Sequence, residues 1–533
     1  MRLDADVLVL GGGPAGAWAA LGAAEAGASV VLADKGYLGT SGAAAGGGNN
    51  LWYLPPDPGL RAAAIAGRQR LGGLLTDVDW MARVQEETFR QVNRLASWGY
   101  PFPRDASGQE RRSSLQGPEY MRRMRRRVHR GGVRILDHHP ALELLADEAG
   151  VVTGAAGLRR QEGFARWEVR AGAVVLATGG CAFLSRAFGL NVDTGDGHLM
   201  AAELGAELSG MEFSAVYGAS PEFGNHTKGL MMQYATYYDE RGRPLGTAGP
   251  AGRDLLARRL AAGERVFARL DRAPAALREA MRRSQPNYFL PMEKAGIDVF
   301  TQPYPLRLVL EGTVRGTGGL RLSGEDCATT VPGLYAAGDV ATRELVTGAA
   351  SGGGSLNGAW AISSGTWAGA GAARFAGTRG PLPPPGALRP AGRAGMRPGG
   401  PGVGRAEVDA FVAAVQERVL PLRHNYFRTA EGLTESLRLL DPLWEQARDR
   451  LGAAPGDGRT ALRAREAAAL AAHARWMYRS ALARAESRGV HRREDRPAAG
   501  PGLAHRLLVS GLDRVAVRRD PVAPRLLTGA GVP

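Results

Sequence analysis

The chain has 533 residues, 44% of them hydrophobic and 22% charged, so it is long enough for about two to four domains and is not a largely disordered protein. Cys181 and Cys327 are too few for a disulfide framework or a thiolate metal site, and we expect neither a metal ion nor an iron–sulfur cluster within this chain. The formal net charge of +15 comes almost wholly from arginine, since the lysines are Lys35, Lys228 and Lys294, and we interpret it as a compositional bias.

The N-terminus predicts a βαβ unit that binds a dinucleotide. Val7–Leu10 is an apolar run typical of a strand buried on both faces, and glycines at 11, 13 and 16 follow it with the G-x-G-x-x-G spacing. These glycines allow a tight turn, a close approach of the backbone to a pyrophosphate and close packing of helix on strand, while the helix N-terminus offers free N–H groups. The residues expected around the pyrophosphate are Gly11, Gly13, Pro14, Ala15 and Gly16.

A second strand and a glycine-rich loop follow. Ala28–Ala33 is apolar, and Asp34 comes about 20 residues after the turn, where a carboxylate accepts hydrogen bonds from a ribose. The loop 39–48 has too little side-chain bulk to build a core and suits close approach to a flat ligand. The spacing of apolar residues over 76–98 then predicts a helix.

Two segments bear on location. Asp4 and Asp6 would interrupt the apolar stretch of a signal peptide, so we expect a cytoplasmic protein. Residues 345–373 contain no charged side chain, but they are dominated by Gly, Ala and Ser and include Asn357. We therefore predict a buried, closely packed helix there and no transmembrane segment.

Later segments divide the rest of the chain. Apolar runs that end in glycine turns, at 173–180 and 333–339, predict further buried strands. The stretch 217–318, which is richer in Tyr, Arg and Pro, separates them and predicts an inserted domain. The many Pro and Gly residues over 376–404 indicate a linker. From 405 to 488 apolar residues recur at spacings of three and four residues, which predicts a helical C-terminal domain.

Five further motifs occur in the order found in one enzyme family. They are Ala177–Gly180, Asp193–Gly197 before a predicted helix, Met211–Phe213, Gly333–Asp339, and Ala485–His491 followed by Arg493–Asp495. On these motifs the chain resembles, over most of its length, the flavoprotein subunits of the succinate dehydrogenase, fumarate reductase and L-aspartate oxidase superfamily.

This resemblance implies FAD and an α/β fold with a Rossmann-like FAD-binding domain, an inserted α+β capping domain and a C-terminal helical domain. The implied division is 1–216 and 319–375 for the FAD-binding domain, 217–318 for the capping domain, 376–404 for the linker and 405–533 for the mainly helical domain.

The resemblance also implies roles for single residues. Asp34 would hold the adenosine ribose, and Asp339 would accept hydrogen bonds from hydroxyls near the pyrophosphate, although Asp339 could instead cap a helix. A helix that begins at Ser355 and Leu356 would direct its N–H groups at the flavin pyrimidine ring and stabilise negative charge there. The other implied FAD contacts are Lys35, Ser41, Gly42, Gly47, Ala177, Thr178, Gly179, Asp196 and Gly338.

The chain departs from the family pattern at two places. In the succinate and fumarate enzymes the loop after the second strand carries a histidine bonded covalently to FAD, whereas residues 36–48 contain none and Ser41 stands at the aligned place. We therefore expect non-covalent FAD. The family clamps a dicarboxylate with two histidines and an arginine, and the corresponding residues here are Tyr217, Val314 and Ser351. We therefore do not expect succinate or fumarate as the substrate.

Arg253 and Tyr217 are the catalytic candidates. Arg253 matches the family's proton-donating arginine; because arginine normally keeps its proton, its chemistry alone indicates an anion clamp. The structural alternative is an ion pair with Asp254 or Glu264. Tyr217 either contacts the substrate or packs under the capping domain.

Three further residues rank lower. His226 and Arg315 are secondary candidates for the substrate site, and His198, after the Thr-Gly-Asp-Gly turn, is expected to be structural. The expected reaction is hydride transfer between FAD and a small anionic substrate.

Electron partners and two alternative functions remain open at this stage. Segments 41–50, 77–102 and 351–355 look more like the α subunit of adenylylsulfate reductase, and that likeness implies a separate iron–sulfur or ferredoxin-like partner. One alternative is a stand-alone amino acid oxidase of the L-aspartate oxidase kind. The other is a nucleic-acid-binding flavoprotein, for which residues 122–130, a predicted helix with a basic face, are the candidate.

Overall fold

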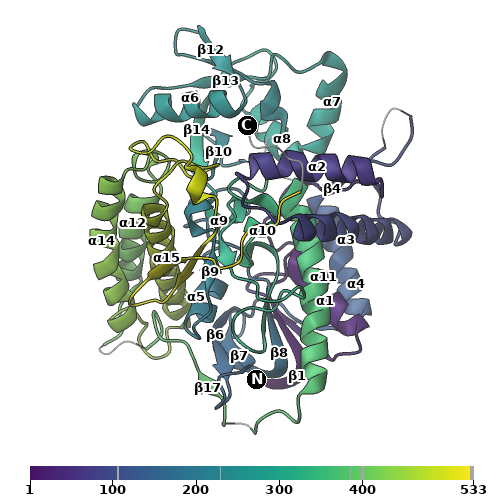
Figure 1. Ribbon diagram of the computed structural model, residues 1–533, viewed down its shortest axis with the longest axis vertical. Helices are drawn as coiled ribbons and strands as arrows, with labels where there is room; N and C mark the ends of the chain where they lie inside the picture. Colours follow the sequence, from purple (N-terminus) through teal and green to yellow (C-terminus); the bar gives the residue numbers. More distant parts are fainter. Residues whose placement is uncertain (105–106, 228–229, 354, 385, 398–400, 528–533) are drawn as a thin grey trace.

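The computed structural model describes residues 1–104, 107–227, 230–353, 355–384, 386–397 and 401–527 (Figure 1). Its base is a mostly parallel sheet in the order β17 (Arg389–Pro390), β6 (Ala141–Ala146), β7 (Val152–Arg159), β8 (Ala165–Leu176), β1 (Arg2–Leu10), β2 (Val30–Ala33) and β5 (Arg134–Leu136), with β16 (Leu334–Ala336) beside β8. Strands β8, β1, β2 and β5 run parallel, and β16 joins them at the C-terminal half of β8. The strands predicted at 7–10, 28–33, 173–180 and 333–339 are confirmed.

Helices cover both faces of this sheet, so the C-terminal halves of the inner strands are apolar: Val7, Leu8 and Val9 are 0% exposed. The predicted helix over 76–98 is α3 (Val78–Ser97), and the one over 122–130 is α4 (Gly117–Arg130). The remaining elements of this part are α2 (Pro58–Leu71), β3 (Gly48–Asn50), β4 (Ser114–Gln116), α5 (Asp196–Ala202), η1 (Met211–Ser214), α9 (Gly312–Arg315), η3 (Gly338–Val340) and α10 (Glu344–Thr347).

Two small-residue helices, α1 (Pro14–Glu25) and α11 (Ser355–Thr378), pack in backbone contact. A Cβ atom on Gly369 of α11 would lie 2.0 Å from the carbonyl oxygen of Ala19, and one on Gly365 would lie 2.4 Å from that of Ala15. This contact explains why residues 345–373 carry so much Gly and Ala. The predicted buried helix is therefore confirmed, and its composition reflects close packing on α1.

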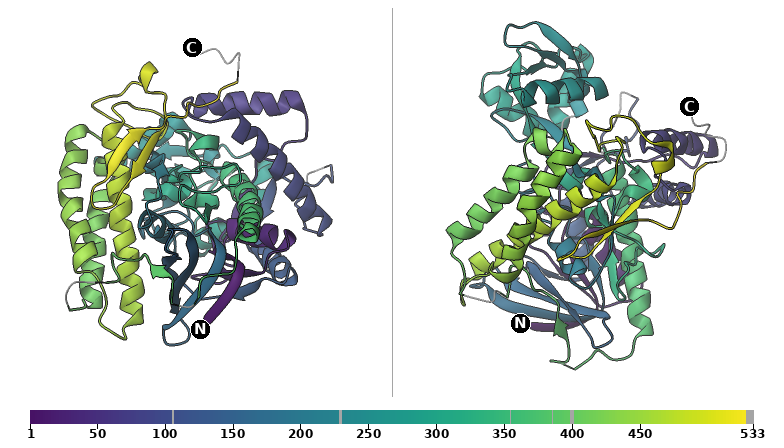
Figure 2. Two further views of the ribbon diagram at one scale, coloured as in Figure 1. Left: turned by 60° about the horizontal axis from the view of Figure 1, so that its bottom comes forward. Right: turned by 60° about the vertical axis from the view of Figure 1, so that its left-hand side comes forward.

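A second sheet lies above this base and forms, with its helices, what we call the cap (Figure 2). Its five strands are antiparallel, in the order β10 (Tyr217–Pro221), β14 (Tyr304–Leu310), β13 (Phe267–Arg269), β11 (Thr236–Tyr238) and β12 (Pro244–Thr247). Three helices accompany the sheet: α6 (Pro250–Ala261), α7 (Ala275–Ser284) and α8 (Pro286–Lys294). The short η2 (Leu230–Tyr234) precedes β11.

The C-terminal part is a set of helices beside the base, visible in Figure 2 as the green and olive layer. They are α12 (Arg405–Val419), α13 (Leu422–Asn425), α14 (Ala430–Asp449) and α15 (Gly458–Ala483). After η4 (Pro501–Leu503) the chain adds two strands that the sequence analysis did not predict, β18 (Leu507–Ser510) and β19 (Ala516–Arg519). They extend a sheet begun by β9 (Leu208–Ser209) and β15 (Gly319–Leu320). The predicted α/β fold class with a helical C-terminal domain is confirmed.

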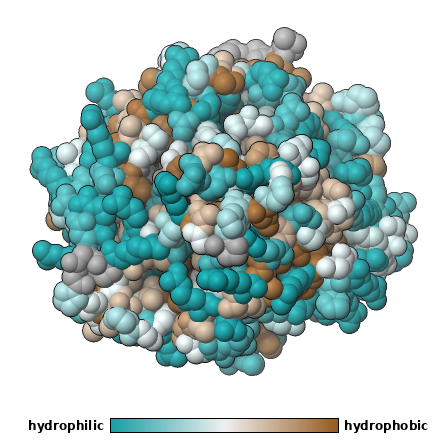
Figure 3. All heavy atoms as spheres, turned by 90° about the horizontal axis from the view of Figure 1, so that it is seen from below, coloured by the Kyte–Doolittle hydropathy of each residue, from teal (hydrophilic) through white to brown (hydrophobic). Residues whose placement is uncertain are grey.

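Among the helices of the described ranges, none combines the length and the apolarity needed to cross a membrane. The face in Figure 3 carries mostly hydrophilic side chains, with hydrophobic ones between them.

Buried charges join the base to the C-terminal part. Glu212 of η1 accepts a hydrogen bond from Nε of Arg484, just after α15, at 2.7 Å. Glu344 of α10 accepts one from the hydroxyl of Ser209 and is fully buried. Burial, followed by the charge of nearby Glu212, raises the pKa of Glu344 to about 8. The Glu344 carboxyl is thus mostly protonated near neutral pH.

We expect Gly369→Ala to lower the free energy of unfolding by about 1–3 kcal/mol, because the new methyl group would press on the carbonyl of Ala19. Gly377→Ala on the same helix is the matched control: nothing lies within 4 Å of its Cβ position, and alanine favours helix. The measurement is urea denaturation of both variants. Equal stability of the two would contradict the packing of α1 on α11.

The raised pKa of Glu344 predicts a pH dependence of stability. Unfolded glutamate ionises from about pH 4.5, whereas Glu344 in the folded protein holds its proton to about pH 8. Since the unfolded state therefore loses its proton first, stability falls as pH rises through this window. Over this pH window we expect the free energy of unfolding of Glu344→Gln to fall by about 1–3 kcal/mol less than that of the parent protein. The control is Glu148→Gln at an exposed glutamate, whose unfolding should follow the parent from pH 5 to pH 8. A Glu344→Gln profile parallel to the parent would refute the assignment.

Candidate functional site

A cavity of about 670 Å³ lies where the base, the cap and the C-terminal part meet. Most of the predicted cofactor contacts line it. Those that do are Gly11, Gly13, Pro14, Ala15, Asp34, Lys35, Ser41, Gly42, Ala177, Thr178, Gly179, Asp196, Gly338 and Asp339. The residues Gly16, Gly47, Ser355 and Leu356 are not in its lining, although Gly48, Asn357 and Gly358 beside them are.

The glycine turn after β1 forms a cradle without side chains. Gly11 has a φ of +111°, and a Cβ on it would lie 2.2 Å from the carbonyl oxygen of Ala177. A Cβ on Gly42 would lie 2.8 Å from the Cα of Gly13. Gly16 lies outside the cavity lining and lets α1 pack closely on the turn, because a Cβ there would lie 1.8 Å from the carbonyl oxygen of Gly11. No side chain caps the N-terminus of α1, so its first N–H groups are available to an anion such as a pyrophosphate.

Asp34 stands at the C-terminal end of β2, beside this cradle. Its carboxylate accepts a hydrogen bond from the backbone N–H of Gly12 at 3.0 Å and another from the hydroxyl of Ser41. Burial raises the pKa of Asp34, while the hydrogen bonds from Ser41 and Gly12 act in the opposite direction. The hydroxyl of Ser41 is therefore bonded to Asp34.

Lys35 and Asp196 both line the cavity, but their side chains bind each other. The Lys35 Nζ lies 2.8 Å from Asp196 Oδ2, 2.6 Å from Glu466 Oε1 and 2.9 Å from Thr194 Oγ1. Burial alone would lower the pKa of Lys35, but attraction to Asp196 and Glu466 raises it overall. Because the three N–H groups of the ammonium have these partners, Lys35 joins the base to α15.

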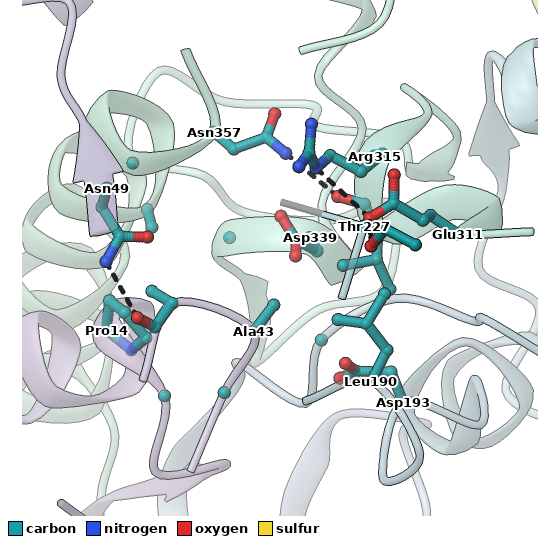
Figure 4. Close-up of a pocket in the computed structure, with 18 of the residues that line it drawn as sticks. Pro14, Ala43, Asn49, Leu190, Asp193, Thr227, Glu311, Arg315, Asp339 and Asn357 are labelled. Carbon is teal, nitrogen blue, oxygen red and sulfur yellow. Dashed lines mark hydrogen bonds and ion pairs between the residues drawn. The ribbon is translucent and has the colours of Figure 1, made fainter. Parts of the chain in front are cut away.

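Asp339 lies among the residues that line the cavity (Figure 4), and a buried arginine holds it. Arg343, four residues later, is 1% exposed and forms an ion pair with Asp339. Its Nη2 also donates to the carbonyl oxygens of Thr313 and Val314, at 2.9 and 3.0 Å. Asp339 lies inside η3, so it is not the N-cap of that helix. Arg343 was not among the residues predicted from the sequence; its spacing of four residues from Asp339 was the available signal.

Polar side chains gather at the end of the cavity near α9 (Figure 4). Thr227 donates its hydroxyl to Glu311 Oε1 at 2.7 Å, and Arg315 Nε lies 3.6 Å from the same oxygen. Asn357 of α11 donates to the carbonyl oxygen of Val314 at 3.1 Å. Its own side-chain oxygen is buried and has no hydrogen-bond partner among the described residues, so it can accept from a ligand. The secondary candidate Arg315 is thus part of the site.

Arg253 lines the cavity from α6 with an exposed side chain. Neither of its expected partners binds it, because Asp254 pairs with Arg258 at 2.9 Å and Glu264 with Arg259 at 2.7 Å. In the described part of the chain Arg253 forms no ion pair, so the structural alternative for it is wrong.

Arg492, which the sequence analysis missed although it lies between motif residues, also lines the cavity, with its Cζ 4.4 Å from the ring centre of Tyr426. Its side chain likewise forms no ion pair among the described residues. Arg253 and Arg492 therefore present two cations from distant segments to one cavity.

Tyr217 lines the cavity, but its hydroxyl is bonded to the C-terminal part. The hydroxyl donates to the carbonyl oxygens of Val419 and Leu420, at 3.2 and 3.0 Å. These contacts join β10 to the end of α12 and favour the packing interpretation of Tyr217.

The secondary candidate His226 and the histidine expected to be structural, His198, both lie outside the cavity lining. His226 is buried, with its ring centre 5.1 Å from that of Phe188. His198 is buried against His473, at 4.6 Å between ring centres, and burial lowers the pKa of His198 to about 3. His198 is therefore neutral and part of the packed interior, as the sequence analysis expected. No group of three or more His, Cys, Asp and Glu residues suited to a metal ion occurs in the described ranges.

Comparison with known protein families agrees with this arrangement. Residues 6–235 match the family described as FAD binding domain, and residues 417–518 match the family described as Fumarate reductase flavoprotein C-term. The L-aspartate oxidase of Streptomyces coelicolor is 28% identical over 375 residues, which cover 64% of this chain and 63% of that relative, less than two thirds of its length.

Solved structures share the fold. The E. coli quinol fumarate reductase FrdA has a TM-score of 0.82 at 22% identity, covering 99% of this chain and 98% of that one. The adenylylsulfate reductase from Archaeoglobus fulgidus has a TM-score of 0.73 at 19% identity, covering 99% and 96%. The arrangement of base, cap and C-terminal helices is thus common to these proteins.

Proposed function

We propose that this chain is an FAD-dependent oxidoreductase related to the flavoproteins of fumarate reductase, succinate dehydrogenase and L-aspartate oxidase, and that it transfers a hydride between non-covalent FAD and a small anionic substrate. When bound, FAD supplies the hydride chemistry, and the protein supplies position and charge.

The cradle fits the cofactor. Gly11, Gly13 and the N-terminus of α1 would hold the pyrophosphate, because the turn at Gly11 leaves no room for a side chain against Ala177 and no side chain caps the first N–H groups of α1. Asp34 and Asp339 would accept hydrogen bonds from its hydroxyl groups. The N-terminus of α11, whose early residues Asn357 and Gly358 line the cavity, would face the flavin ring and favour negative charge on it.

The loop behind β2 supports non-covalent binding. Residues 36–48 contain no histidine, and Ser41 uses its hydroxyl to bond Asp34. Retention of FAD would then depend on hydrogen bonds and packing alone, so we propose that denaturation releases it.

The main support for an anionic substrate is the position of Arg253. It lines the cavity without an ion-pair partner among the described residues, and arginine keeps its charge at all working pH values. Arg492 lies on the same cavity from the C-terminal part. Together they would bind and orient an anionic group, and Arg253, by its family position, would also stand where a proton is exchanged.

The electron partner is a separate proposal. The fold shared with adenylylsulfate reductase supports an iron–sulfur or ferredoxin-like protein as donor or acceptor. The similarity to L-aspartate oxidase favours a second candidate, a stand-alone amino acid oxidase. Peroxide formed from L-aspartate and oxygen by the flavin-loaded protein would select the second candidate.

The nucleic-acid alternative gains no support from α4. Three of its six arginines are ion-paired within the protein: Arg122 and Arg123 pair with Glu119, and Arg125 pairs with Asp137 at 2.8 Å.

We expect Arg253→Gln to weaken the binding of carboxylates to the flavin-loaded protein by about 10–100-fold, because a charged hydrogen-bond donor is lost. Binding is followed as the change in the visible flavin spectrum during titration with acetate, butyrate, octanoate, succinate and fumarate. Arg259→Gln is the matched control on the same helix, since Arg259 pairs with Glu264 outside the cavity lining. Unchanged affinity in Arg253→Gln, or no response to any carboxylate, would sink the proposal.

A further inference from the structure

The cap end of the cavity has an apolar wall made by the cap's own hydrophobic core. Tyr237 and Leu256 are buried members of that core, at 4% and 1% exposure. Four half-buried residues packed on the same core complete the wall. They are Ala219, Met232, Ala248 and Leu308. All six residues line the cavity, so this hydrophobic surface faces the ligand space.

The wall and the cation Arg253 are held in a fixed relation by shared elements. Ala219 on β10 and Leu308 on β14 are direct partners in the antiparallel sheet. Leu256 follows Arg253 by three residues on α6, which places the two on one face of that helix. A ligand bound to Arg253 therefore meets apolar surface next to its charged group.

Beyond Arg253 and Arg492, a second anionic group of a ligand would find no unpaired cation among the described residues that line the cavity. Among the residues aligned with the family's dicarboxylate clamp, Val314 is apolar and the hydroxyl of Tyr217 is bonded to backbone carbonyls. Ser351 likewise donates its hydroxyl to the carbonyl oxygen of Arg315 at 3.1 Å. Arg315 itself lies 3.6 Å from Glu311, which offsets its charge.

We propose that the substrate is a monocarboxylate with an apolar body. Its carboxylate binds between Arg253 and Arg492, and its body covers the wall formed by Met232, Tyr237 and Leu308. This assignment rests on the proposed function, because it names the class of anion that the same site takes. Because both arginines would bind the first carboxylate, a dicarboxylate would place its second charge against apolar side chains, where an unpaired charge is strongly disfavoured.

The test titrates the flavin-loaded protein with butyrate, hexanoate and octanoate and with adipate, the dicarboxylate that matches hexanoate in length. The visible flavin spectrum reports binding. We expect affinity to rise about threefold to fourfold for each added methylene until the wall is covered, and adipate to bind at least about tenfold more weakly than hexanoate.

Variants separate the wall from the charge. Leu308→Ala should weaken the binding of octanoate by about fivefold or more and leave the binding of butyrate nearly unchanged. The matched control is Leu277→Ala on α7, an exposed leucine of the cap outside the cavity, which should change neither. Arg492→Gln should weaken butyrate and octanoate by the same factor, about tenfold.

Two outcomes overturn this inference while the proposed function stands: adipate binding as tightly as hexanoate, or affinity that does not change with chain length and is insensitive to Leu308→Ala. A flavin-loaded protein that responds to no carboxylate overturns the proposed function as well. The results therefore distinguish a wrong substrate class from a wrong site.

Discussion

Contact between backbones at glycine is the constraint on which the site depends. Gly16 lets the first turn of α1 touch the carbonyl oxygen of Gly11, and Gly365 and Gly369 let α11 lie against α1. Each contact excludes even one methyl group. Because these elements meet so closely, the N-termini of both helices and the C-terminal ends of β1 and β2 open into a single cavity. The residues proposed to hold FAD are therefore placed by packing before any ligand binds.

Two positively charged side chains reach this cavity, one from the cap and one from the C-terminal part. Arg258 of α6 pairs with Glu494 at 3.2 Å and lies over the ring of Phe427, so the cap rests on the C-terminal part. The same contact region brings Arg253 and Arg492 to the cavity from the two sides. In the account proposed here, base and FAD provide the redox chemistry, while cap and C-terminal part select the anion. Arg343 contributes from within, since it fixes both Asp339 and the α9 segment.

Features set by local chemistry could be predicted from the sequence. The glycine spacing, the buried strands, Asp34 at the end of β2 and the start of α11 follow from short-range patterns, and the structure has all of them. Features set by tertiary contact could not. The hydroxyl of Tyr217 points to α12 because a domain 200 residues later offers carbonyl oxygens. Arg492 enters the site only because its segment folds back, and β18 and β19 exist only because β9 offers an edge.

The most direct test of the account is the fate of the cofactor when the protein is denatured. The purified protein should show the visible spectrum of a flavin, and acid precipitation should leave a colourless pellet with FAD in the supernatant. A pellet that stays yellow would contradict non-covalent binding, and a colourless protein that does not take up added FAD would contradict the cradle itself.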